Sequence, residues 1–202
     1  MNTTEIKISG KIDSFDKLWE YAEKQFLSYE KLEGIPDWKK HDFSIDCSDD
    51  QMRFKDMLQI RCIEELTEAT HALDNTDHFF EEVTDSLNFF LSAYIMAGFD
   101  LSSMEHPLRM REYRLYEPSY EICCEKFYRI VDDIGDLCNL LKNRPWAQSN
   151  YLVSMKDFDD RANTLWEDFW KMIWNFIPNE MIVFELFERK YEVNKWRIRT
   201  GY

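Results

Sequence analysis

The chain of 202 residues carries a formal net charge of −14, and 45% of its residues are hydrophobic and 16% aromatic. This hydrophobic content is typical of a folded protein and excludes an extended disordered chain. Five Gly and five Pro are too few for a sandwich or barrel, which needs a turn about every ten residues, so the composition favours long helices. The acidic charge argues against nucleic acid or an anionic membrane as partner, since both need a basic surface.

The cysteines and the apolar runs indicate where the protein works. The five cysteines form no C-x-x-C pair, are odd in number and follow no signal-like N-terminus, which predicts reduced thiols and a cytoplasmic location. The most apolar run, at 87–99, has thirteen residues, which is too short to cross a bilayer. We therefore expect no membrane span.

Hydrophobic periodicity predicts a series of helices along the chain. With boundaries uncertain by a few residues, the helical segments are 13–33, 50–74, 77–98, 119–142, 157–177 and 180–198. Residues that favour turns or N-caps separate them, among them Asn75 and Pro178. The sequence thus predicts one all-α domain over 1–202, folded as a helical bundle.

A helical hairpin is repeated in the sequence. The helix pair 63–73 and 79–90 resembles the pair 131–141 and 158–169 in its acidic positions. In this alignment Glu64, Glu65 and Glu68 match Asp132, Asp133 and Asp136, and Glu81, Glu82 and Asp85 match Asp159, Asp160 and Asn163. Because the second copy shortens every Glu and neutralises the last acid, we expect a metal-binding hairpin over 58–100 and a degenerate one over 119–177. Chance similarity between acidic helices is the alternative.

Two acidic pairs, Glu65 with Glu68 and Glu82 with Asp85, have the i, i+3 spacing that places both carboxylates on one helical face. Among 39 acids about seven such pairs arise by chance, so the spacing alone is weak evidence. Phe89, however, lies near the line of Glu82 and Asp85, which predicts that this face is partly covered. If the two helices pack antiparallel, four carboxylates converge, and each pair repels by roughly 3 kcal/mol at about 5 Å. A cluster of oxygen ligands alone suits Mg²⁺ or Mn²⁺.

The C-terminal segment 180–202 carries polar and cationic side chains along one face. Lys190, Asn194 and Arg197 follow one another at four- and three-residue steps and so share a side of a helix. We expect them to hold phosphate oxygens next to the carboxylates, because Lys and Arg are common phosphate ligands. Gly201 is expected to end the helix as a left-handed cap. An ordinary amphipathic helix is the alternative.

Three motifs taken together resemble a known family. EELTE at 64–68, EEVTD at 81–85 and KYEVNKWRIRTGY at 190–202 resemble the motifs of the all-α nucleoside triphosphate pyrophosphohydrolases, most closely the dimeric dUTPases and their phage dCTPase/dUTPase relatives. The resemblance implies a homodimer that hydrolyses dUTP, and also dCTP, to the monophosphate and pyrophosphate with Mg²⁺. The catalytic and metal-binding residues that it implies are Glu65, Glu68, Glu82 and Asp85.

The resemblance also assigns the remaining site residues. It implies phosphate binding by Lys190, Asn194, Arg197 and Tyr202, and base binding by Gln25 and Asn88. The sequence departs from the family pattern at Asn88, where the family often has His, and at Ile198, where it often has Gln.

Two alternative functions follow from the same sequence. One is a MazG-like nucleotide pyrophosphohydrolase of broad specificity, and the other is an acidic, non-catalytic interaction protein that mimics DNA. The cationic face at Lys190 and Arg197 favours an enzyme over a DNA mimic. The tryptophans Trp166, Trp170 and Trp174 recur every four residues, which indicates either core or a dimer interface.

Overall fold

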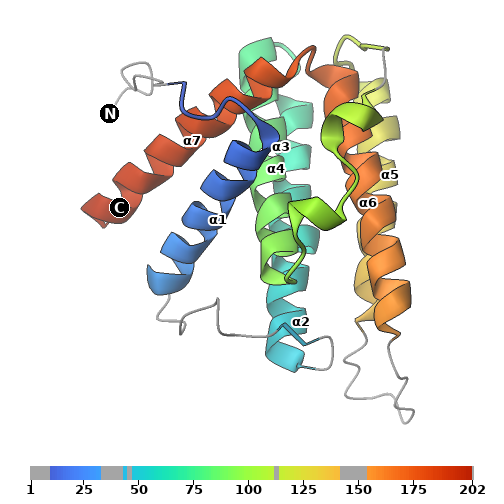
Figure 1. Ribbon diagram of the computed structural model, residues 1–202. Coiled ribbons are helices and arrows are strands. Elements are labelled where there is room, and N and C mark those ends of the chain that lie inside the picture. Colours follow the sequence, from blue (N-terminus) through green and yellow to red (C-terminus); the bar gives the residue numbers. More distant parts are fainter. Residues whose placement is uncertain (1–9, 33–42, 45–46, 112–113, 142–153, 202) are drawn as a thin grey trace.

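The computed structural model describes residues 10–32, 43–44, 47–111, 114–141 and 154–201, and its elements in these ranges are helical, without a strand (Figure 1). This confirms the all-α prediction. The α-helices are α1 (Phe15–Leu32), α2 (Ser48–Lys55), α3 (Ile63–His71), α4 (Thr76–Met96), α5 (Tyr120–Leu140), α6 (Met155–Phe176) and α7 (Glu180–Thr200). The 3₁₀ turns η4 (Leu101–Ser103) and η5 (Pro107–Met110) follow α4.

The helix predicted over 50–74 is continuous but has three parts. Between α2 and α3 lies a π-helical segment, η3 (Asp56–Cys62), whose flanking residues Lys55 and Ile63 keep right-handed helical dihedral angles. A π-helix bonds residue i to i+5, so its turns are wider than those of an α-helix, and such segments often occur at functional sites. The periodicity of the sequence did not predict this change.

Side chains cap the helices at the predicted breaks. The Asn75 side chain accepts a hydrogen bond from the His78 backbone N–H at 3.3 Å and begins α4. Asn179, directly after Pro178, accepts one from the backbone N–H of Ile182 at 3.1 Å and begins α7. Such caps satisfy backbone donors that have no partner inside the helix.

The end of α7 is also formed as predicted. Gly201 has a φ of 65°, in the left-handed region, and its N–H bonds to the carbonyl of Arg197. A residue without Cβ adopts this conformation without steric cost.

The central helix of the bundle is α4. In Figure 1 it runs through the middle, with α1 and α7 on one side and α5 and α6 on the other. It packs against α1, α3, η3 and α7, and its buried residues include the polar Thr84, Asp85, Ser86 and Asn88. Because a buried polar group is costly without a partner, these side chains need either a hydrogen bond or a function.

The three tryptophans of α6 are part of the core. Trp166, Trp170 and Trp174 are each 1% exposed. The indole N–H of Trp166 donates to the carbonyl of Glu105, and that of Trp174 to the carbonyl of Pro107, both at 2.9 Å. Of the two alternatives in the sequence, core is therefore the correct one. The expected homodimer gains no support from this aromatic stripe.

Two further findings concern the whole described chain. None of its helices combines the length and the apolar character that a membrane crossing requires. All five cysteines are free thiols, three of them buried.

Candidate active site

A cavity of about 600 Å³ opens between α1, the α2–η3–α3 rod, α4 and α7. Its wall combines carboxylates, cations, amides and apolar side chains, so it offers several chemical environments within one space. A volume of this size is in the range of small-molecule binding sites.

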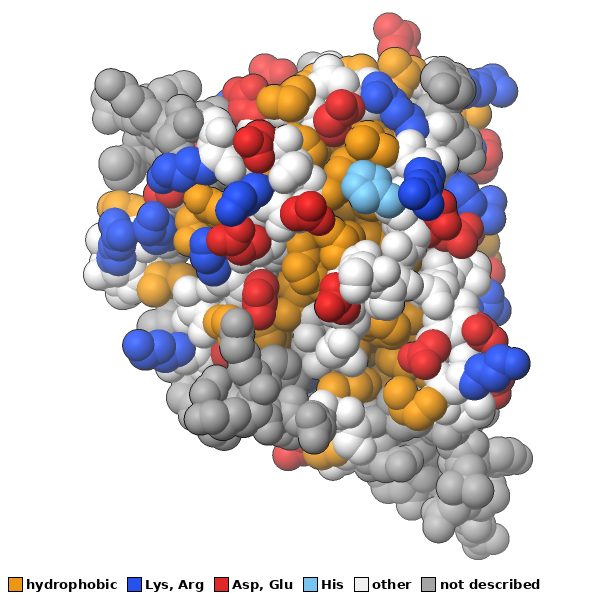
Figure 2. All heavy atoms as spheres, viewed as in Figure 1, with side chains coloured by type: hydrophobic (Ala, Val, Ile, Leu, Met, Phe, Trp, Pro, Cys, Tyr) orange, Lys and Arg blue, Asp and Glu red, His pale blue; other side chains and the backbone are white. Residues whose placement is uncertain are grey.

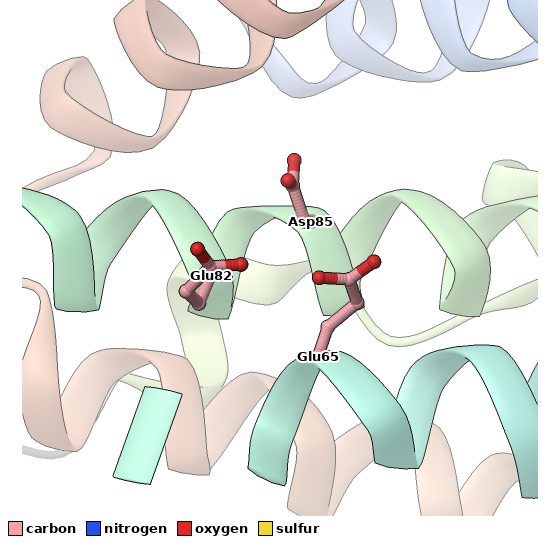
Figure 3. A group of neighbouring side chains, drawn as sticks. All are labelled: Glu65, Glu82 and Asp85. Atoms are coloured by element: carbon pink, nitrogen blue, oxygen red, sulfur yellow. The ribbon is translucent and has the colours of Figure 1, made fainter. Parts of the chain in front are cut away.

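Three of the predicted carboxylates come together beside this cavity, and two of them, Glu65 and Asp85, line it. Glu65 extends from α3 toward Glu82 and Asp85 on α4, and one oxygen of each lies within 4.8 Å of the others (Figure 3). The i, i+3 spacing on α4 places Glu82 and Asp85 on one side of that helix, and the packing of α3 against α4 brings Glu65 to them. Among the described residues, this group is the one whose geometry suits a metal ion.

The fourth predicted carboxylate does not join the group. Glu68 is exposed, and the metal-suited cluster does not include it. Leu66 and Ala69 are the buried residues of α3, and they fix which side of this helix faces the bundle. Glu68 lies about 60° around the helix from Glu65, which is enough to turn it to solvent. The expectation of four convergent carboxylates is therefore met by three.

Burial and mutual repulsion raise the pKa values of this cluster. The pKa of Glu65 rises to about 8, first because of burial, then through the charge of Asp85 and a hydrogen bond with Glu82. Burial raises the pKa of Asp85 to about 6, although the ammonium of Lys190 opposes the shift. At neutral pH Glu65 therefore keeps a proton unless a cation replaces it, whereas Asp85 is mostly ionised and pairs with Lys190.

The predicted cationic face of α7 lines the same cavity. Lys190 donates to Oδ2 of Asp85, and Asn194 and Arg197 lie on the wall. Asn194 is 3% exposed, an unusual degree of burial for an amide near the end of a surface helix. All three predicted phosphate ligands on α7 thus line the cavity that Glu65 and Asp85 also line. Tyr202 lies outside the described residues.

The two residues expected to bind the base are hydrogen-bonded to each other. Gln25 Nε2, on α1, donates to Oδ1 of Asn88, on α4, at 2.7 Å, and both side chains are buried and line the cavity. Within the described part of the chain, Gln25 Oε1 is buried without a hydrogen-bond partner. A buried acceptor without a donor calls for an explanation, and a bound ligand provides one.

Some residues of this site were not predicted from the sequence. Tyr29 of α1 and Arg53 and Arg61 of the α2–η3 wall also line the cavity. Nε2 of His78, on α4, lies 2.6 Å from Glu82 Oε1. Arg53 and Arg61 precede Glu65 by twelve and four residues, which are multiples of four. This spacing indicates a shared side of the rod only when the π-helical segment η3 is known.

The second hairpin neutralises its acids with arginines. Arg161 pairs with Asp136 and lies 3.8 Å from Asp133, while Arg129 lies 2.6 Å from Asp168. Burial, followed by the charge of Asp168, raises the pKa of Asp133 to about 6. Asp133, Asp136 and Asp168 are thus part of ion pairs, and among the described residues of α5 and α6 no group of acids has a geometry that suits a metal ion.

Residues that match in the sequence alignment of the two hairpins do not make matching contacts in the structure. Asp160 and Asn163, the counterparts of Glu82 and Asp85, are exposed. The carboxylate that meets Asp133 belongs instead to Asp168, which the alignment did not select.

Comparison of the chain with protein-family models, with curated proteins and with solved structures found no match. Function is therefore inferred from the side chains of the cavity, together with the resemblance of the three motifs.

Proposed function

We propose that this protein is an Mg²⁺-dependent nucleoside triphosphate pyrophosphohydrolase that converts dUTP, and also dCTP, to the monophosphate and pyrophosphate. The observation that carries the proposal is a cluster of three carboxylates, two of which line one cavity together with a cationic helix face and a pair of amides. The carboxylates would bind a metal ion, the cationic face a phosphate chain and the amides a base.

The donor set fits a hard divalent cation. Glu65, Glu82 and Asp85 offer oxygen ligands within 4.8 Å of one another, and neither Cys nor His belongs to the group. Mg²⁺ prefers carboxylates and keeps several waters, which suits a half-open site beside a cavity. When bound, the ion would polarise phosphoryl oxygens and lower the pKa of a coordinated water. A carboxylate of the cluster would accept the proton of that water.

The residues of α7 would hold the substrate. Lys190 now neutralises Asp85, so a cation at the carboxylates would free its ammonium for a phosphate oxygen. Asn194 and Arg197 would donate further hydrogen bonds along the same chain of phosphates. The helix is closed at Gly201, which fixes the orientation of its last turn and with it Arg197.

The amide pair can bind the edge of a base, and the preference for pyrimidines comes from the resemblance to dUTPases. When Gln25 donates one hydrogen bond to Asn88, the pair retains the Oε1 acceptor and one N–H of Gln25 and the NH₂ donors of Asn88. Uracil offers N3–H beside O4, and cytosine offers N4–H₂ beside N3, so each presents one donor next to one acceptor. Both bases therefore match the pair, whichever way the two amides are oriented.

The duplication of the hairpin and the homodimer remain parts of this proposal. The resemblance to dimeric dUTPases supports both. The acids of the two hairpins also have different partners, which supports a metal-binding role for the first hairpin and a structural role for the second. In the second hairpin Arg129 and Arg161 supply positive charge permanently. The first hairpin has Lys190 alone at Asp85, which leaves a place for a bound cation.

A DNA mimic fits the distribution of charge less well. In Figure 2, Lys and Arg side chains lie at both the left and the right of the view and are interspersed with Asp and Glu. A surface that imitates DNA needs uninterrupted acids. The carboxylates of the cluster are partly covered, so they contribute little to an outer acidic surface.

A screen for pyrophosphate release tests the proposal. Each dNTP and NTP is incubated with the protein in millimolar Mg²⁺ or in EDTA. We expect release from dUTP and dCTP with Mg²⁺ alone, lost in Glu82→Gln and kept in Glu81→Gln, a matched change at the adjacent, more exposed acid. Release from every base would favour the broad MazG-like activity, and no release from any nucleotide would contradict the proposal.

A further inference from the structure

Two arginines of the α2–η3 wall, Arg53 and Arg61, line the cavity and are held differently. Arg53 donates to the carboxylate of Glu30, a side chain that is 5% exposed, and this bond fixes its guanidinium against α1. The side chain of Arg61 is 52% exposed, and its guanidinium nitrogens lie 3.8 Å from oxygens of Asp56 and Glu64.

The contacts of Arg61 are weak. A distance of 3.8 Å is beyond hydrogen-bond range, and the side chains of both acids are about half exposed, where water and salt screen the attraction. The guanidinium can therefore turn to a stronger anion at little cost. Arg53 cannot do so without leaving Glu30 buried and uncompensated.

The π-helical segment η3 brings Arg61 to the cavity. Arg53, Met57, Arg61 and Glu65 recur every four residues, and all four line it. In an α-helix each four-residue step rotates the side chain by roughly 40°, so three steps would carry it away from the cavity. The wider turns of η3 oppose this rotation. Arg61 consequently lies one turn from Glu65 on the same side of the rod.

We propose that Arg61 binds the phosphate chain of the substrate from the η3 side, as a substrate-positioning residue; this inference rests on the proposed function. Lys190 and Arg197 reach the cavity from α7, and both η3 and α7 pack against α4. A triphosphate next to the carboxylates then meets cations from two separate helices. Arg61 suits this role because a guanidinium binds two phosphate oxygens in parallel.

Calorimetric titration of Arg61→Ala tests the inference. Three probes are used with Mg²⁺: dUMP, inorganic pyrophosphate, and dUTP with an imido group between the α- and β-phosphorus, which resists cleavage. We expect the Kd of the imido analogue and of pyrophosphate to rise about ten- to a hundredfold, and that of dUMP by less than about twofold. Arg61→Lys should restore part of the affinity, and Arg109→Ala, an exposed arginine on η5, should change none of the three values.

The results separate this inference from the proposed function. If the unmodified protein binds and cleaves dUTP but Arg61→Ala binds the analogue equally well, the role of Arg61 is wrong and the function stands. If dUMP is weakened as strongly as the analogue, Arg61 supports the fold of the cavity and not the phosphates. If the unmodified protein binds none of the probes, both proposals are wrong. In turnover, Arg61→Ala should raise KM more than it lowers kcat.

Discussion

Glu65→Gln should stabilise the metal-free protein while removing its response to Mg²⁺. The folded state raises the pKa of Glu65 from 4.5 to about 8, so the folded chain binds a proton more tightly than the unfolded chain. Its contribution to stability is present below pH 4.5 and is lost as the pH rises toward 8. Glutamine carries no charge at any of these pH values, so the variant does not lose stability as the pH rises toward 8.

The expected gain follows from the size of the shift. The full shift corresponds to about 5 kcal/mol, and since Glu65 is only partly buried, solvent screening reduces this to about 2 kcal/mol. For a chain of this length, that free energy raises the melting temperature by about 4–8 °C. The gain should be full at pH 8.5 in EDTA and smaller at pH 5.5, where the folded protein keeps its proton.

Thermal unfolding followed by circular dichroism measures both effects. With excess Mg²⁺ at pH 8.5 the unmodified protein should melt at a higher temperature than in EDTA, and Glu65→Gln should lose most of this increase. Glu64→Gln is the matched control, since Glu64 is exposed and should change stability by less than about 0.5 kcal/mol. The reasoning is refuted if Glu65→Gln gains no stability in EDTA at pH 8.5, or gains the same amount at both pH values.

Three other predictions concern activity and assembly. Asp85→Asn should lower turnover of dUTP by orders of magnitude, whereas Asp133→Asn, at an acid already paired with Arg161, should leave it nearly unchanged; equal losses in a steady-state assay would contradict the choice of hairpin. Arg197→Ala should lower kcat/KM by about thirty- to a thousandfold, equally for dUTP and dCTP, and Arg197→Lys should recover part; a loss confined to one base would point to base binding instead. Analytical ultracentrifugation at micromolar concentration should give a homodimer, and a monomer would remove the dimer from the proposal.

The helices could be predicted because their signals are local. Period, caps and turn residues act within a few positions, so Asn75, Pro178 and Gly201 identified the ends of elements that the structure contains. The acids Glu82 and Asp85 were predicted for a related reason. They share one helix, and their spacing alone places them together.

What could not be predicted depends on packing between helices. Which side of α3 meets α4 is decided by Leu66 and Ala69, and this leaves Glu68 in solvent although its spacing from Glu65 is the same as that within the α4 pair. The sequence pattern does not distinguish a π-helical turn from an α-helical one. Arg61 was therefore missed.

Two walls of the cavity, α4 and η3, differ in their backbone hydrogen bonding. α4 is covered along most of its length, so its backbone amides should open to solvent only when much of the bundle unfolds. Glu82 and Asp85 are thus attached to a nearly immobile base. η3 departs from α-helical bonding, and its Leu58 and Cys62 are buried in the core. The cavity therefore combines an acidic floor on α4 with a wall whose π-helical turns set the direction of Arg61 and Glu65.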